Sequence, residues 1–579
     1  MVSAEKDKNE IKVMVVGDSI SHGREGDWTW RYRIWEWFSQ EAINVRFVGP
    51  YKGTVPPEEP HPPRPPRLED EPLQLPAPLR TDGGYAAGVH RDFLSNCHHF
   101  AASGQQAFVA KDLVAEQVAA YQPDICLVQL GFNDLGWRMC GPGPTLASIG
   151  DLIEEARSAK PDLKFAVANV PQRTDIPGRE DLPRDTDLYN HMLVQEITHW
   201  NTPKSPVALV CFCENYSCGG TNSDAAYDGL HPNALGEYQL AQAFSRTLVS
   251  DFSLGRSPLA IPESVPSRPL PTPARFGAAS TPAGIIVNWN TVYGALGYDL
   301  QHRLAGDSEW ATTHIDCNRY YWSALRDGQL VECRVRTSGG DNLKSPWSYV
   351  AAAVAKPETP PPPHNMVTRA TATGFTITWD PPPPTSYTGE IDRYGLIYFD
   401  CDQPGVFPEV MGVRGDSAEL KDLRPGHRYA IAMGSWSTVG QGLPAGAPSV
   451  VVGGEIPHTP KCVRVKAFDC HNVELSWQPV SGATGYGIWL RCCGPDGPED
   501  PILHSRMNAT IRDAAPSEPQ RETCEIWVLD PPWHCRFAVS ALNHNVSSRR
   551  SKWLTPSRPS GEEFTMPENA TIHIHLGQK

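Results

Sequence analysis

Short, almost continuous apolar runs recur through the first 250 residues, and a helix-like stretch separates each run from the next. A strand that is apolar on both faces must be covered on both sides, as happens in a parallel sheet flanked by helices. The clearest runs lie at residues 11–16, 45–48, 124–130, 164–170 and 207–212, and the helical stretches at about 30–40, 112–120, 145–160, 186–200 and 233–250. We therefore expect a three-layer α/β domain in this part of the chain.

The sequence pattern changes after residue 273, where short strands alternate with turns in a unit that repeats three times. Each repeat has a strand that ends in tryptophan, at Trp289, Trp379 and Trp477. Alternating strands with one buried Trp per unit are typical of small β-sandwiches, and the repeats resemble fibronectin type III modules. The second repeat carries that family's tyrosine corner at Tyr429, whereas Val331 and Cys535 stand at this place in the other two.

These two sequence patterns predict a multidomain chain. We expect an α/β domain at 1–256, a Pro/Ser linker at 257–272, all-β sandwiches at 273–355, 356–455 and 456–557, and a tail at 558–579. Inside the first domain, residues 53–80 are rich in proline and charge. Such a stretch cannot build a core of its own, so we expect a solvated surface insertion rather than a partner-binding segment.

The composition narrows the classes of partner and location. A net charge of −15 works against binding to nucleic acid or to anionic membranes. The charged N-terminus has no apolar core of a signal peptide, and no run approaches 18 apolar residues, so we expect no membrane span and an extracellular location only if a native leader was removed. The 15 cysteines are an odd number, and the group Cys211, Cys213 and Cys218 has no His at ligand spacing, so no metal is expected.

Four polar blocks of the α/β domain each lie at the end of a strand or the start of a helix. They are Gly17-Asp18-Ser19-Ile20, Gly104, Gly131-Phe132-Asn133-Asp134 and Asp228-Gly229-Leu230-His231-Pro232. Any one of them could be a turn or a helix cap. Together and in this order they resemble the SGNH (GDSL) hydrolase superfamily, which implies a flavodoxin-like fold, and the chain lacks the G-x-S-x-G elbow of the α/β-hydrolases.

This resemblance implies a serine esterase with Ser19 as nucleophile, His231 as general base and acid, and Asp228 as the residue that orients the histidine. Those residue types suit the chemistry, because a serine hydroxyl needs an adjacent base and the imidazole needs a fixed tautomer. The resemblance also implies an oxyanion hole made of the backbone N–H of Ser19, the N–H of Gly104 and the side-chain amide of Asn133. No cofactor is implied.

Other polar and aromatic residues flank these blocks. We expect Asp18 and Asp134 to hold loop structure rather than to take part in catalysis. The aromatic candidates for substrate contact are Trp28, Trp30, Tyr32 and Phe132, since a tryptophan near Ser19 could stack on a sugar face.

The substrate class follows from a finer resemblance. Residues 11–23, 32–33, 46–50, 131–135 and 228–241 are similar to carbohydrate esterase family 3, the branch that contains acetylxylan esterases, which implies removal of acetyl groups from a carbohydrate. The insertion and Phe132 depart from that branch. A lipid-directed esterase, lysophospholipase or thioesterase would use the same triad. A non-catalytic adhesion or scaffold protein would instead act through the β modules, which we expect to be spacers or to bind a polysaccharide or protein surface.

Overall fold

The computed structural model describes residues 10–557 except 74–77, 324, 372, 385–386, 388, 404, 454–456, 493–500, 510–520, 529–530 and 544–545. The chain forms two compact units. The first unit comprises Met1–Pro62 and Leu73–Lys356, and the second comprises Pro63–Pro72 and Pro357–Lys579. The predicted tail at 558–579 lies outside the described residues.

The first unit contains the predicted α/β domain, built on a parallel sheet of strand order β2-β1-β4-β5-β6. A two-residue strand, β3, pairs with the end of β1. The strands are β1 (Ile11–Gly17), β2 (Val45–Phe47), β3 (Phe100–Ala101), β4 (Ile125–Gln129), β5 (Lys164–Ala168) and β6 (Val207–Val210). Each predicted apolar run is thus confirmed as a strand, and the central strand β4 is buried along its whole length.

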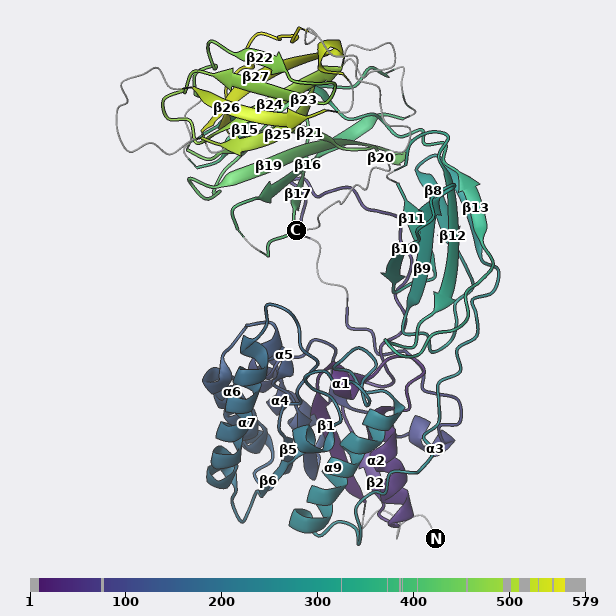
Figure 1. Cartoon of the computed structure of the whole chain (residues 1–579). Helices are drawn as coiled ribbons and strands as arrows, with labels where there is room; N and C mark the ends of the chain where they lie inside the picture. Colours follow the sequence, from purple (N-terminus) through teal and green to yellow (C-terminus); the bar gives the residue numbers. More distant parts are fainter. Residues whose placement is uncertain are drawn as a thin grey trace. The chain divides into compact units, whose positions relative to one another are not determined.

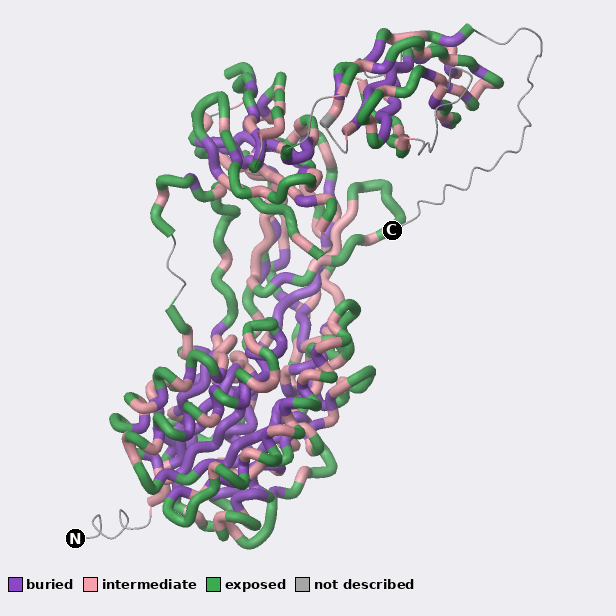
Figure 2. Tube along the Cα trace, turned by 90° about the vertical axis from the view of Figure 1, so that its left-hand side faces the viewer, coloured by how far each residue is buried: buried purple, intermediate pink, exposed green. Residues whose placement is uncertain are grey.

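Helices cover both faces of this sheet, which gives three layers. Helix α4 packs against α6, and α6 against α7, whereas α2 packs against α9 (Figure 1). The long helices are α2 (Thr29–Gln40), α4 (Ala107–Tyr121), α6 (Pro142–Ala159), α7 (Asp181–Trp200) and α9 (Ala234–Phe252). The short ones are α1 (Ser19–His22), α3 (Arg91–Leu94), α5 (Phe132–Gly136) and α8 (Phe212–Asn215). Figure 2 shows that many buried residues lie inside this domain. Among the described residues no helix is both long and apolar enough to cross a membrane.

The first unit also contains one β-sandwich, whose sheets have the orders β10-β9-β12-β13 and β11-β8-β7. Its strands are β7 (Gly277–Thr281), β8 (Gly284–Asn288), β9 (Tyr298–Leu304), β10 (Ala311–Ile315), β11 (Arg319–Trp322), β12 (Leu330–Thr337) and β13 (Ala351–Val354).

Two further sandwiches lie in the second unit. The second sandwich pairs the sheet β14-β15-β18 with β17-β16-β19-β20, to which β21 adds on β19, and the third pairs β22-β23-β26 with β25-β24-β27-β28. The second comprises β14 (His364–Ala370), β15 (Phe375–Asp380), β16 (Ile391–Asp400), β17 (Glu409–Val413), β18 (Ser417–Leu420), β19 (Arg428–Ser437), β20 (Gly440–Gln441) and β21 (Ala445–Val451). The third comprises β22 (Arg464–Ala467), β23 (Asn472–Trp477), β24 (Gly485–Cys492), β25 (Ile502–Asn508), β26 (Glu522–Trp527), a 3₁₀ turn (Pro532–His534), β27 (Cys535–Asn543) and β28 (Val546–Ser547).

Each sandwich core is centred on an edge-to-face pair of aromatic rings, with centroids 5.0–5.3 Å apart. The pairs are Trp289–Tyr298, Trp379–Tyr394 and Trp477–Tyr486. The repeated tryptophans of the sequence therefore mark the same structural position three times. In the second sandwich the hydroxyl of Tyr429 accepts a hydrogen bond from the Arg424 N–H at 3.3 Å, while Val331 and Cys535 are buried apolar substitutes.

Two segments without regular structure pack more closely than their composition suggests. Leu259, in the expected linker, is buried in the core of the α/β domain, and the half-buried Arg268 farther along forms an ion pair with Asp27. The expectation of a solvated insertion is wrong for Leu68, which is buried, and the segment Pro63–Pro72 around it belongs to the second unit.

Candidate active site

The loop after β1 places Ser19 at the start of the short helix α1. Asp18 caps this helix, since its Oδ1 accepts the N–H of Ile20 at 2.9 Å, and its Oδ2 accepts the side-chain amide of Gln129 at 3.2 Å. Burial raises the pKa of Asp18 to about 7. Gly17 makes the turn possible, because a Cβ there would collide with the side chain of Ser21. Asp18 therefore supports the loop that presents Ser19.

Ser19, His231 and Asp228 form one hydrogen-bonded chain, although Ser19 and His231 are 212 residues apart in sequence. Ser19 Oγ lies 2.8 Å from His231 Nε2, and His231 Nδ1 lies 2.7 Å from Asp228 Oδ2. The other carboxylate oxygen of Asp228 accepts the N–H groups of Leu230 at 3.2 Å and His231 at 2.8 Å. The ring of Tyr227 stacks on the imidazole at a centroid distance of 5.6 Å.

The charge state of Asp228 suits its place in this chain. Burial raises the pKa of Asp228, but the hydrogen bonds and the charge of His231 outweigh burial and hold the pKa below its usual value. An ionised Asp228 accepts a hydrogen bond from the N–H group at His231 Nδ1 and leaves Nε2 free to accept one from Ser19. The arrangement can therefore withdraw a proton from the serine hydroxyl.

The second and third sequence blocks meet beside each other. The side-chain amide of Asn133, at the start of α5, donates to the Gln105 carbonyl at 2.9 Å, next to Gly104. Asp134 accepts the N–H groups of Ala107 at 2.8 Å and Phe108 at 3.1 Å, so it caps α4 and ties the two blocks together. The structure therefore joins Asn133 and Gly104 in one corner, and Asp134 holds that corner.

A glycine is required at position 104. Its φ is +79°, which L side chains rarely adopt, and an added Cβ would lie 2.9 Å from the ring of Trp137. Trp137 is 57% exposed, so it is the open aromatic side chain at this corner. The backbone at Gly104 can approach a ligand closely.

Three of the four aromatic candidates for substrate contact lie in the interior, so the prediction is wrong for them. Trp30 stacks on Phe244 at 4.6 Å, and Tyr32 packs edge-on against Phe93 at 5.1 Å. Phe132 is 5% exposed and belongs to the main core. Trp28, in contrast, lines a pocket.

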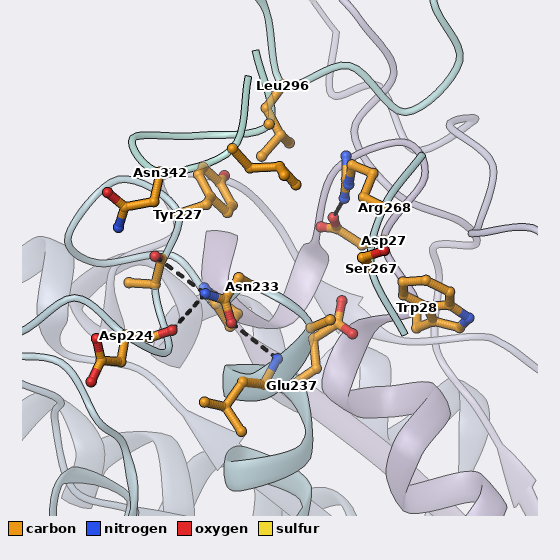
Figure 3. A pocket seen from close by; sticks show the side chains of 16 residues that line it. Asp27, Trp28, Asp224, Tyr227, Asn233, Glu237, Ser267, Arg268, Leu296 and Asn342 are labelled. Carbon is orange, nitrogen blue, oxygen red and sulfur yellow. Dashed lines mark hydrogen bonds and ion pairs between the residues drawn. The ribbon is translucent and has the colours of Figure 1, made fainter. Parts of the chain in front are cut away.

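Two neighbouring cavities lie beside Ser19. The smaller, of about 10 Å³, is lined by Ser19 and His231, and the larger has about 270 Å³ (Figure 3). Both cavities share four lining residues, Asp27, Tyr227, Pro232 and Glu237. The shared lining makes them adjoining parts of one binding region.

The larger pocket is completed by the first β-sandwich. Its lining includes Leu296, Gly339, Asn342 and Leu343 of that sandwich together with Trp28 and Tyr227 of the α/β domain, and Figure 3 shows Asn342 beside Tyr227. Sequence reasoning missed these residues, because nothing local in a β module marks a contact with a distant domain.

Hydrogen bonds and an ion pair hold the first β-sandwich and the linker against the α/β domain within the first unit. The N–H of Asp341 donates to the Tyr227 carbonyl at 2.6 Å, and the Tyr293 hydroxyl donates to the Tyr85 carbonyl at 2.6 Å. Arg268 forms an ion pair with Asp27. Among the residues that the structure describes, no three His, Cys, Asp or Glu side chains group as metal ligands would.

Residues 13–244 match the family model of the GDSL-like lipase/acylhydrolases, and residues 360–452 match that of the fibronectin type III domain. The α/β domain has the SGNH fold. A carboxylic ester hydrolase is the activity that the GDSL-like match supports.

Solved structures similar to the chain include carbohydrate esterases of family 3. The one from Talaromyces cellulolyticus is 22% identical, with 41% of this chain and 96% of that chain covered and a TM-score of 0.32. The one from Clostridium thermocellum is 18% identical, with 43% and 100% covered and a TM-score of 0.30. Among curated proteins, receptor-type tyrosine-protein phosphatase F of Bos taurus is 30% identical over 126 residues, which are 22% of this chain. The chain spans only 6% of that relative's length.

Proposed function

We propose that this chain is a serine esterase that removes short acyl groups, above all acetyl, from a carbohydrate. The observation that carries the proposal is the hydrogen-bonded chain from Ser19 through His231 to Asp228, at 2.8 and 2.7 Å. Hydroxyl, imidazole and carboxylate in this order are the groups that acyl transfer through a serine requires.

The reaction then has two halves. Ser19 Oγ attacks the ester carbonyl carbon while His231 Nε2 takes the hydroxyl proton, and the tetrahedral intermediate collapses as His231 returns that proton to the leaving alcohol. Water attacks the acyl-enzyme in the second half, His231 again carries the proton, and the free acid leaves. Asp228 stabilises the imidazolium in both halves.

The negative oxygen of the intermediate needs hydrogen-bond donors. We assign this role to the N–H groups of Ser19 and Gly104 and to the amide of Asn133. Because Asn133 donates to the Gln105 carbonyl in the free protein, its amide must exchange that partner for the oxyanion as the reaction proceeds.

The cavity against Ser19 supports a short acyl group. Its volume of about 10 Å³ is that of a single water-sized site, which favours a short acyl group over a long chain. We expect kcat/KM for p-nitrophenyl acetate to exceed that for the octanoate ester by at least about tenfold, since a mispacked chain costs about 1–3 kcal/mol. Initial rates on the acetate, butyrate and octanoate esters test this. Faster hydrolysis of octanoate would favour the lipid-directed alternative.

The larger pocket supports a carbohydrate as the alcohol. Its volume of about 270 Å³ lies just below the range of about 300–1,000 Å³ typical of small-molecule sites. Trp28 offers an aromatic face and Asn342 a side-chain amide, which suit the apolar face and the hydroxyl groups of a sugar. Acetate release from a panel of acetylated polysaccharides, compared with deacetylation of small aryl esters, tests this assignment. No release from any polysaccharide would contradict it.

A substitution in the first β-sandwich should therefore change the hydrolysis of sugar substrates and leave that of small aryl esters unchanged. Asn342→Ala is expected to raise KM for an acetylated xylo-oligosaccharide by about 2- to 10-fold, the worth of one hydrogen bond, and to leave p-nitrophenyl acetate hydrolysis unchanged. Asn290→Ala, at another exposed asparagine of the same sandwich, is the matched control. An equal loss on both substrates would indicate a structural effect instead.

A further inference from the structure

The second sandwich has an open sheet edge, and part of the proline-rich insertion lies on it. Strand β17 is the edge strand of the sheet β17-β16-β19-β20. Edge strands expose unpaired backbone groups that can take up another segment. Here the N–H of Gly412 donates to the Arg67 carbonyl at 2.8 Å, and Leu68 forms a parallel bridge with the same glycine. Residues Pro63–Pro72, the docking segment, thus extend this sheet.

A buried arginine holds the docking segment at two points. Arg393, on β16, has a side chain that is only 9% exposed. Its guanidinium contacts both carboxylate oxygens of Glu71 at 2.8 Å and donates to the Pro66 carbonyl at 3.0 Å. The hydrogen bond between the Glu71 carboxylate and Arg393 lowers the pKa of Glu71. A buried guanidinium needs such partners, and a fork-to-fork pair with a carboxylate gives direction as well as attraction.

Two glycines of the sandwich make room for the prolines. A Cβ on Gly412 would collide with the Pro66 carbonyl, and one on Gly395 would lie 3.4 Å from Pro66 Cγ and 3.1 Å from the indole nitrogen of Trp436. Leu68 is 4% exposed, whereas Glu69 and Asp70 point to solvent. The contact therefore combines a backbone pairing, an apolar anchor, a proline packed close to a glycine and a charge pair, and backbone pairing to a sheet edge with pockets for side chains is a recurring mode of peptide recognition.

We propose that the edge of the second sandwich is a binding site for a proline-rich acidic peptide and that the chain's own docking segment fills it in cis. The segment lies in the insertion of the SGNH domain, so docking closes a loop between partners 322–327 residues apart in sequence. The insertion then serves as a tether between the hydrolase domain and the second module. This inference is independent of the esterase proposal.

Trypsin can report whether the segment is docked. The bond after Arg67 precedes the buried Leu68, whereas the bond after Arg64 is followed by proline. Leu68→Ala should release the segment and raise the rate of cleavage after Arg67, followed by mass spectrometry on the full chain, by at least about tenfold, because it removes the apolar anchor without placing an acid at the cleaved bond, and cleavage tracks the population of the open form. Leu73→Ala, at a neighbouring leucine that is 78% exposed, is the matched control. Equal cleavage rates in the wild type and both variants would overturn the proposal.

A peptide tests the site itself. The labelled peptide PPRPPRLEDEPL, residues 62–73, should bind the Leu68→Ala chain at least about tenfold more tightly than the wild type, whose tethered segment competes at high effective concentration. The same peptide with Glu71→Gln should lose about tenfold in affinity, as a charged hydrogen bond is lost, whereas the Glu69→Gln peptide should bind like the unchanged one. Equal binding of all peptides, or none to the released chain, would contradict a specific site.

The mass in solution separates a docked segment of the same chain from one of a second copy. Light scattering should give a monomer for both the wild type and the Leu68→Ala chain. A wild-type dimer that becomes a monomer in the variant would show that the segment docks on a second copy and would overturn the cis assignment.

Discussion

Replacement of Ser19 by alanine should lower kcat/KM for p-nitrophenyl acetate by about 10⁴-fold or more, because it removes the only proposed covalent path. The hydroxyl lies 2.8 Å from His231 Nε2, and without it the remaining histidine and oxyanion donors can only assist water. Initial rates on the purified variant, with circular dichroism as a check of folding, measure the effect.

Ser103→Ala is the matched control for this variant. Ser103 is an exposed serine beside Gly104, and its contribution to the fold is the backbone N–H that donates to His22, which alanine retains. It should keep activity within about twofold, as expected for a surface position. Equal rates for the wild type and Ser19→Ala would exclude the serine mechanism and would favour the scaffold alternative.

Replacement of Asp228 by asparagine should cost about 10³–10⁴-fold in kcat with little change in folding. The amide oxygen can still accept the N–H groups of Leu230 and His231 that Asp228 caps. The amide NH₂ would then face His231 Nδ1, so the ring would carry its proton on Nε2 and could no longer accept one from Ser19. A pre-steady-state burst on p-nitrophenyl acetate shows whether acylation is the step that slows.

Asp175→Asn provides the control for that variant, since Asp175 is exposed on the neighbouring loop, whose Thr174 N–H donates to the Gly229 carbonyl. It should leave kcat within about twofold. A loss in Asp228→Asn no greater than that of the control would show that His231 acts without a carboxylate partner.

The strands of the SGNH domain and the four blocks could be predicted because their signals are local. An apolar run such as residues 124–130 must be covered on both faces, and a Gly-Asp-Ser turn directly after a strand both caps a helix and exposes a hydroxyl. The short helices α3, α5 and α8 contain too few turns to show a periodic pattern, so they could not be predicted in this way.

The aromatic residues show where sequence reasoning failed. Trp28 precedes α2 and lines the pocket, whereas Trp30, two residues later, is fully buried against Phe244. Proximity to Ser19 in sequence cannot distinguish the two, because the direction of each side chain depends on what packs against that helix. The position of the Trp137 ring, which is exposed and lies over Gly104, likewise depends on tertiary packing and not on its place in the sequence.

By itself, the sequence determined the two kinds of domain and the residues that could carry acyl transfer. Strand burial, turn chemistry and the order of the blocks all depend on residues close together in the sequence. Only the tertiary structure decided that Ser19 and His231 meet at 2.8 Å, that the first sandwich closes the pocket beside them, and that Glu71 pairs with Arg393. These three results join residues far apart in sequence, and packing and charge pairing between such residues leave no local pattern to read.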